Sequence, residues 1–206
     1  MKTLVIVDVQ NDFIPGGALA VPKGNEVVPI INDLLPHFEL IVATQDWHPN
    51  NHKSFASNHE NKQTFDIIEL EGLEQKLWPD HCIQDTPGAD FVSYLENRPI
   101  EAIFRKGMDP EIDSYSGFYD NGHKKSTGLA GYLKEKGTSE LYFCGLAGDI
   151  CVYFTLLDAL KEGFTATLIE DASKPLDTSD YQKAKEDILK KGGKIVHSKD
   201  ILNTYR

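Results

Sequence analysis

Residues 141–160 read Leu-Tyr-Phe-Cys-Gly-Leu-Ala-Gly-Asp-Ile-Cys-Val-Tyr-Phe-Thr-Leu-Leu-Asp-Ala-Leu. The apolar run 141–144 is short enough to be a buried strand, and it breaks at a glycine-rich turn, 145–148. Apolar residues then recur at helical spacing after Asp149, which is a predicted N-cap. Cys151 therefore falls in the first turn of a helix, where free N–H groups favour a thiolate. Alternatively, Cys151 is one more small buried apolar residue, as most free cysteines are.

The rest of the chain alternates strand-like and helix-like segments. We expect strands at residues 4–7, 40–44, 102–104, 141–144, 165–169 and 194–196. We expect helices at residues 25–35 (capped by Asn25), 91–97, 126–136, from 150 onward, 179–191 and 198–202. This alternation predicts a single α/β domain over residues 1–206, with a mainly parallel sheet of about six strands.

Residues 46–90 form a segment that we call the excursion. It holds Pro, Asn, His and Gly with little periodicity, which is long for a loop in a compact domain. Such a segment is either disordered or functional. Its two tryptophan-bearing clusters and His81 favour an ordered, functional excursion.

Composition narrows the classes of partner. The formal net charge of −11 over 206 residues argues against nucleic acid and anionic membrane. No apolar run approaches the roughly 20 residues that span a bilayer. The N-terminal apolar run ends at Asp8 without a cleavage site, so we interpret it as a core strand. Three widely spaced cysteines do not make a disulfide framework, and the cytoplasm is the expected compartment.

Reactive side chains follow four successive predicted strands. Asp8 follows the first, Asp46 and His48 follow the second, Lys106 follows the third, and Cys151 lies one turn beyond the fourth. Parallel strands present their carboxyl ends on one side of a sheet, so these side chains should converge there.

Asp8, Lys106 and Cys151 make a coherent nucleophilic set. A thiol that attacks a carbonyl needs a group that takes its proton and later protonates the leaving group, and a carboxylate can do both. A lysine beside it keeps the carboxylate charged and favours the thiolate. The turn 145–148 offers backbone N–H groups for an oxyanion hole. Taken singly, Asp8 could be a turn residue and Lys106 a solvated charge, but their joint placement favours chemistry.

Asp46 and His48 form a second set. Residues two apart in extended chain point to the same side, so these two can grip one cation, with His81 from the excursion as a third ligand. Three oxygen and nitrogen ligands suit a catalytic zinc, manganese or iron site. His52 and His59 are weaker candidates for the same metal.

Aromatic residues lie in the same loops. Phe13, Trp78 and Tyr115 could wall a flat aromatic substrate, although aromatic residues are more often plain core.

Six motifs resemble those of the isochorismatase-like cysteine hydrolases and, within that superfamily, those of the nicotinamidases. They are Asp8-Val9-Gln10-Asn11-Asp12-Phe13 with Gly16-Gly17-x-Leu19, Thr44-Gln45-Asp46-Trp47-His48-Pro49, Asn51-His52-x-Ser54-Phe55, Trp78-Pro79-x-His81-Cys82, Arg105-Lys106-Gly107 and Gly145-Leu146-Ala147-Gly148-Asp149-Ile150-Cys151-Val152. The resemblance implies a three-layer sandwich with helices on both faces of the sheet. It also implies a cis peptide between Leu146 and Ala147.

The resemblance also implies roles for these residues. Cys151 would be the nucleophile, Asp8 the proton shuttle and Lys106 their electrostatic partner, with the N–H groups of Ala147 and Cys151 as the oxyanion hole. Asp46, His48 and His81 would hold one divalent metal, with zinc the first expectation and manganese or iron the alternatives. Phe13, Trp78, Tyr115 and Ala147 would border the substrate ring.

The implied reaction is hydrolysis of nicotinamide, and also of pyrazinamide, through a cysteine thioester in NAD salvage. Gly148 and Ile150 depart from the residues common in the family, which are Thr and an aromatic or His. One alternative is another amidohydrolase of the superfamily that acts on a non-aromatic amide or carbamoyl group. Two others are a binding protein without catalytic activity and a redox-sensing thiol protein. The helix faces could support a homo-oligomer, but the sequence does not say of what size.

Overall fold

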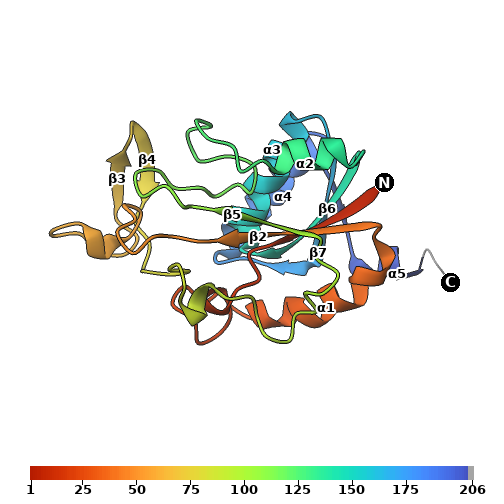
Figure 1. Ribbon diagram of the computed structural model, residues 1–206, viewed down its shortest axis with the longest axis horizontal. Coiled ribbons are helices and arrows are strands. Elements are labelled where there is room, and N and C mark those ends of the chain that lie inside the picture. Colours follow the sequence, from red (N-terminus) through yellow and green to blue (C-terminus); the bar gives the residue numbers. More distant parts are fainter. Residues whose placement is uncertain (204–206) are drawn as a thin grey trace.

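Six parallel strands form the central sheet in the order β5-β2-β1-β6-β7-β8 (Figure 1). The computed structural model describes residues 1–203 of the chain. The strands are β1 Lys2–Val7, β2 Leu40–Asp46, β5 Ala102–Lys106, β6 Glu140–Leu146, β7 Thr165–Lys174 and β8 Lys194–Val196. The predicted parallel sheet of six strands is therefore confirmed.

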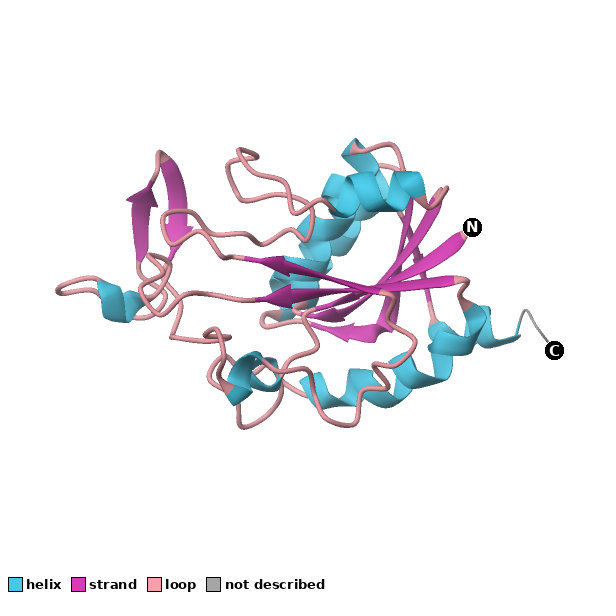
Figure 2. Ribbon diagram, viewed as in Figure 1, coloured by secondary structure: helices cyan, strands magenta, loops and turns pink. Residues whose placement is uncertain are grey.

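Helices cover both faces of this sheet (Figure 2). One face carries α1 Val27–Leu34 and α5 Ser198–Leu202, and the other carries α2 Leu129–Glu135, α3 Tyr153–Lys161 and α4 Thr178–Lys190. Successive residues of a strand point to opposite faces. Accordingly, Leu4 and Ile6 of β1 pack in the core beside α1, whereas Val5 and Val7 pack in the core beside α3. The three-layer sandwich is confirmed.

Three of the expected helices begin later than the sequence suggested, or not at all. Asn25 caps nothing, because a 3-10 turn precedes α1 and its N-cap position is Glu26. The helix expected at 126–136 begins only at Leu129, after Gly128 adopts a left-handed conformation. The helix expected at 91–97 is wrong: the chain there is extended and turned, and Val92 N–H donates to Val9 O beside the end of β1.

The junction after β6 also differs from expectation. Asp149 is not the N-cap: Ala147 occupies that position, and a π-helical turn, Gly148–Val152, precedes α3. The Asp149 carboxylate instead accepts the N–H groups of Leu176 and Asp177, each at 2.9 Å. It therefore ties the start of α3 to the connection between β7 and α4.

The excursion projects beyond the carboxyl ends of β2 and β5 and contains an antiparallel hairpin, β3 Ile67–Leu70 and β4 Leu73–Lys76 (Figure 1). Two backbone hydrogen bonds hold the excursion together, since His48 N–H donates to Cys82 O and Trp78 N–H to Ser54 O. Trp47 N–H donates to Lys106 O and so joins the excursion to the end of β5. Within residues 1–203, no helix is long and apolar enough to cross a membrane.

Candidate active site

Four neighbouring strands, β5, β2, β1 and β6, bring the predicted reactive residues to one edge of the sheet. Asp8 follows β1 directly and has a φ of 48°. A non-glycine residue in this left-handed region is uncommon and often marks a functional position. Asp46 ends β2, Lys106 ends β5, and Cys151 lies in the π-helical turn after β6. All four side chains are buried.

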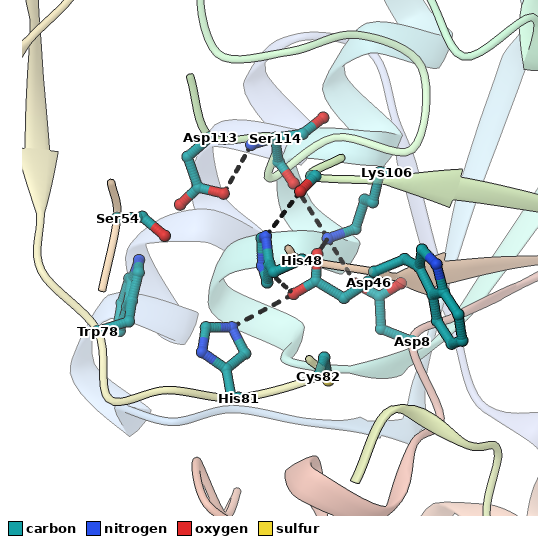
Figure 3. Close-up of polar contacts among 12 residues, drawn as sticks. Asp8, Asp46, His48, Ser54, Trp78, His81, Cys82, Lys106, Asp113 and Ser114 are labelled. Carbon is teal, nitrogen blue, oxygen red and sulfur yellow. Dashed lines mark hydrogen bonds and ion pairs between the residues drawn. The ribbon is translucent and has the colours of Figure 1, made fainter. Parts of the chain in front are cut away.

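Lys106 is the centre of this cluster (Figure 3). Its Nζ lies 2.9 Å from Asp8 Oδ2 and 2.9 Å from Asp46 Oδ1, and it donates to Ser114 O at 3.0 Å. The Sγ of Cys151 lies 3.7 Å from the same nitrogen. Burial alone would lower the pKa of Lys106, but the two carboxylates raise it well above its ordinary value. One permanently charged ammonium therefore joins the thiol to both carboxylates.

Asp8 is suited to accept and return a proton. Burial raises its pKa, and the neighbouring Lys106 charge opposes that shift. Thr44 Oγ1 donates to Asp8 Oδ1 at 2.6 Å and fixes the carboxylate. A carboxyl group whose pKa is raised toward neutrality is a better general base and acid near neutral pH.

The surroundings of Cys151 favour the protonated thiol over the thiolate. Burial raises the pKa of Cys151 well above its ordinary value, and Asp8 and Asp46 raise it further, against the opposing effect of Lys106. The helix end and Lys106 were both expected to favour a thiolate; Lys106 does so, but desolvation and two carboxylates outweigh it. The hydrogen bond with Asp8 gives the proton an acceptor instead.

The side chains of His48 and His81 flank the carboxylate of Asp46 (Figure 3). Their Nε2 atoms lie 3.0 Å and 3.3 Å from the same oxygen, Asp46 Oδ2. Burial would raise the pKa of Asp46, but His48 and Lys106 hold it well below its ordinary value. The carboxylate is therefore ionised over the whole range near neutral pH.

The outer ring nitrogen of each histidine contacts a backbone carbonyl. His48 Nδ1 donates to Gly107 O at 2.9 Å, and His81 Nδ1 donates to Pro79 O at 2.7 Å. With Nδ1 as the donor, the neutral tautomer of each ring would carry its lone pair on Nε2, the atom that lies beside Asp46. Carbonyl acceptors on the outer nitrogen are the usual support of metal-binding histidines. The donor set thus fits a divalent metal of the zinc, manganese or iron class.

Gly107 leaves the space in which the ring of His48 lies. A Cβ at position 107 would lie 2.4 Å from Cε1 and 2.6 Å from Nδ1 of His48, and the φ of Gly107 is +68°. Both the space and the backbone conformation therefore require glycine.

The two other histidines of the excursion differ in position. His52 lies beside His48, with ring centroids 4.4 Å apart, and its donor atoms group with those of His48 and Asp113. Ser54 N–H donates to His52 Nδ1, and burial lowers the pKa of His52 to about 4, so the ring is neutral. His59 turns away and donates to Lys53 O at 2.7 Å, outside both groups.

A narrow pocket opens directly onto the cluster. Phe13, Trp78, Tyr115 and Ala147 line it together with Asp46, His81, Lys106 and Cys151. The pocket has further walls that were not predicted to bind substrate, namely Leu19, Asp113, Ser114, Ile150 and Leu176. Apolar walls around a few convergent polar groups are typical of a small-molecule site.

Three polar residues that support the cluster were missed. Gln10 bridges the excursion to the sheet, donating to Asp46 O and Ala89 O and accepting from Asp46 N–H, each at 2.8 Å. Thr44 fixes Asp8, and Asp113 accepts Ser114 N–H at 2.7 Å beside the Lys106 contact. A polar residue at the end of a buried strand was the available signal for Gln10 and Thr44.

The two departures from the family pattern have different surroundings. A Cβ at Gly148 would lie 2.9 Å from the ring of Tyr181, so Tyr181 fills the space that a side chain would need. Ile150 lines the pocket directly. The peptide between Leu146 and Ala147 is cis, as the resemblance implied.

The Isochorismatase domain family matches residues 2–200 of the chain. This protein belongs to the isochorismatase family. A nicotinamidase from Acinetobacter baylyi is 47% identical over 200 residues, which cover 97% of this chain and 94% of that protein. This isochorismatase-family chain also superposes on a nicotinamidase/pyrazinamidase from Acinetobacter baumannii with a TM-score of 0.95, at 47% identity and 97% coverage of both chains.

A third relative bears on Asp46, His48 and His81, which we call the metal group. A pyrazinamidase from Pyrococcus horikoshii, solved in complex with zinc, is 39% identical with a TM-score of 0.79, and the match covers 95% of this chain and 98% of that chain. These relatives make this isochorismatase-family protein an amidohydrolase of the nicotinamidase type.

Proposed function

We propose that this protein hydrolyses nicotinamide, and pyrazinamide as well, to the corresponding acid and ammonia through a thioester on Cys151. One observation carries the proposal: Lys106 joins a buried thiol–carboxylate pair to a carboxylate flanked by two histidines, and Cys151, Lys106, Asp46 and His81 of this cluster line one pocket. A thiol with its own base suits acyl transfer. A group of nitrogen and oxygen ligands beside it suits a divalent metal.

In the first half of the reaction, Asp8 takes the proton of the Cys151 thiol as Sγ attacks the amide carbon. The developing oxyanion accepts the backbone N–H groups of Ala147 and Cys151. Asp8 then gives its proton to the amide nitrogen, the C–N bond breaks and ammonia leaves. Lys106 keeps a positive charge beside the thiolate and the carboxylate throughout.

In the second half, Asp8 takes a proton from a water molecule that attacks the thioester carbon. The C–S bond breaks, the acid leaves, and Asp8 returns the proton to Cys151. The same residue thus serves as base and acid in both halves, which its raised pKa favours.

The flat ring would lie between Phe13 and Trp78, bordered by Tyr115 and Ala147. Asp46, His48 and His81 would hold a divalent metal, zinc first, with manganese and iron as alternatives. When bound, the metal supplies a Lewis acid that holds and orients the ring nitrogen. In the cell, the reaction would return nicotinamide to NAD synthesis, in the cytoplasm, where free thiols persist.

The test is ammonia release from nicotinamide by the wild type and by Cys151→Ala, with and without chelator. We expect turnover that requires both the thiol and the metal. Cys144→Ala is the matched control, because Cys144 is also buried but does not line the pocket. Turnover by Cys151→Ala would refute the thioester, and full turnover after verified metal removal would refute the metal requirement.

A further inference from the structure

A second cavity, which we call the outer cavity, lies beside the pocket and takes no part in the reaction proposed above. Trp78, Tyr115, Ile150 and Leu176 line both spaces, so the two lie side by side. The pocket is narrow, whereas the outer cavity has a volume of about 480 Å³. A substituent on a ring held in the pocket would therefore have room to extend outward.

A continuous row of aromatic rings walls the outer cavity. The centroids of Phe65 and Trp78 are 6.1 Å apart, those of Trp78 and Tyr115 are 6.2 Å apart, and those of Tyr115 and Phe154 are 5.5 Å apart. The two outermost rings belong to Phe65, which is 59% exposed, and Phe154, which is 39% exposed. Their free faces could pack against an aromatic ligand at the usual contact distances.

The backbone at Phe65 supports a functional placement of its ring. Phe65 has a φ of 75°, and a bulky side chain in this left-handed region is a genuine outlier. Its N–H donates to Leu77 O at 2.6 Å, which ties this turn to the segment that carries Trp78. An unfavourable conformation that leaves an aromatic ring exposed at a cavity mouth points to use of that ring.

The charge around the outer cavity favours a cation. Glu74 and Asp177 line it, and so does Asp180, which pairs with Lys183. Among the lining residues within 1–203, Lys76 is the only base. The local charge is therefore negative, and aromatic faces add a further attraction for a cationic group.

We propose that the outer cavity is a second substrate subsite, which accepts a positively charged aryl substituent on the ring of a heteroaromatic amide. The proposal rests on the proposed function, because that function places the amide ring in the pocket. The subsite would widen the substrates of this protein beyond the bare pyridine and pyrazine amides.

The test uses nicotinamides that carry an (aminomethyl)phenyl group at ring carbon 4, 5 or 6, with phenyl and carboxyphenyl analogues at the same positions. We expect at least one position to be accepted, with kcat/KM falling from the cationic to the neutral to the anionic analogue, by about threefold to fivefold per step. The same ranking is expected for the Kd of Cys151→Ala, which reports binding even if nicotinamide itself is not hydrolysed. Loss of nicotinamide turnover would thus count against the proposed function, whereas the ranking of the three analogues tests the subsite.

Variants locate the effect. We expect Phe154→Ala, and separately Phe65→Ala, to weaken the cationic aryl amide about fivefold to tenfold more than nicotinamide. The double variant Glu74→Gln, Asp177→Asn should remove the preference for positive charge, and asparagine retains the N-cap of α4. Leu189→Ala is the matched control, because Leu189 is 56% exposed and lines neither space. Rejection of every aryl position, or an unchanged ratio in both phenylalanine variants, would overturn the proposal.

Discussion

Lys106 Nζ lies 2.9 Å from Asp46 Oδ1, so the ammonium that contacts Asp8 also contacts a carboxylate of the metal group. We expect Lys106→Met to lose turnover and about 3–5 kcal/mol of unfolding free energy, because two buried carboxylates would remain without their shared cation. Ammonia release and urea unfolding measure the two effects.

The control for Lys106 is Lys53→Met. Lys53 pairs with Glu111, but both side chains are nearly half exposed. Such surface pairs contribute at most about 1 kcal/mol. An equal loss of stability in Lys53→Met and Lys106→Met would contradict the special status of Lys106.

Gly107→Ala should weaken metal binding by Asp46, His48 and His81. The new Cβ would overlap the ring of His48, which could then no longer face Asp46. We expect the bound metal per chain, measured by elemental analysis after dialysis, to fall severalfold. Gly137→Ala is a close control, because Gly137 has nearly the same φ, +69°, but nothing lies within 4 Å of its Cβ position. Equal metal contents in the two variants would show that metal binding does not require glycine at position 107.

Asp8→Asn should lower kcat by about 10²–10⁴-fold, because asparagine keeps the shape but cannot move the proton. The base acts only when ionised, and its pKa is raised above 3.8. In the wild type, kcat/KM should therefore be high at a pH above the pKa of Asp8. It should fall as the pH drops through that pKa, which lies above 3.8. The pH profile of nicotinamide hydrolysis tests this. The residual activity of Asp8→Asn should lack that acidic limb, and an unchanged limb would assign it to another group.

Much of this site could be predicted because its residues follow strands. Asp8, Asp46 and Lys106 each end or follow a run that reads as a buried parallel strand, so the sheet itself brings them together. The spacing of Asp46 and His48 also sufficed, since alternate residues of extended chain share a side.

What could not be predicted depends on contacts between loops. Leu176 reaches the pocket only because the connection between β7 and α4 is tied to Asp149. The raised pKa of Cys151 likewise arises from burial and from Asp46 on another strand. The local sequence pattern predicted a helix that begins near Asp149 and contains Cys151. It carried no information on the residues from other segments that contact them.

Asp149→Ala should loosen the wall of the pocket. Its carboxylate accepts two partly buried N–H groups, those of Leu176 and Asp177, and a typical hydrogen bond contributes about 0.5–1.5 kcal/mol. We expect a lower Tm and a rise in KM for nicotinamide larger than the fall in kcat, because Leu176 touches the pocket but not the thiol–carboxylate pair. Asp149→Asn, which keeps one acceptor oxygen, should lie between the wild type and Asp149→Ala in both Tm and KM. If kcat fell and KM did not change, Asp149 would act on Cys151 rather than on the pocket wall.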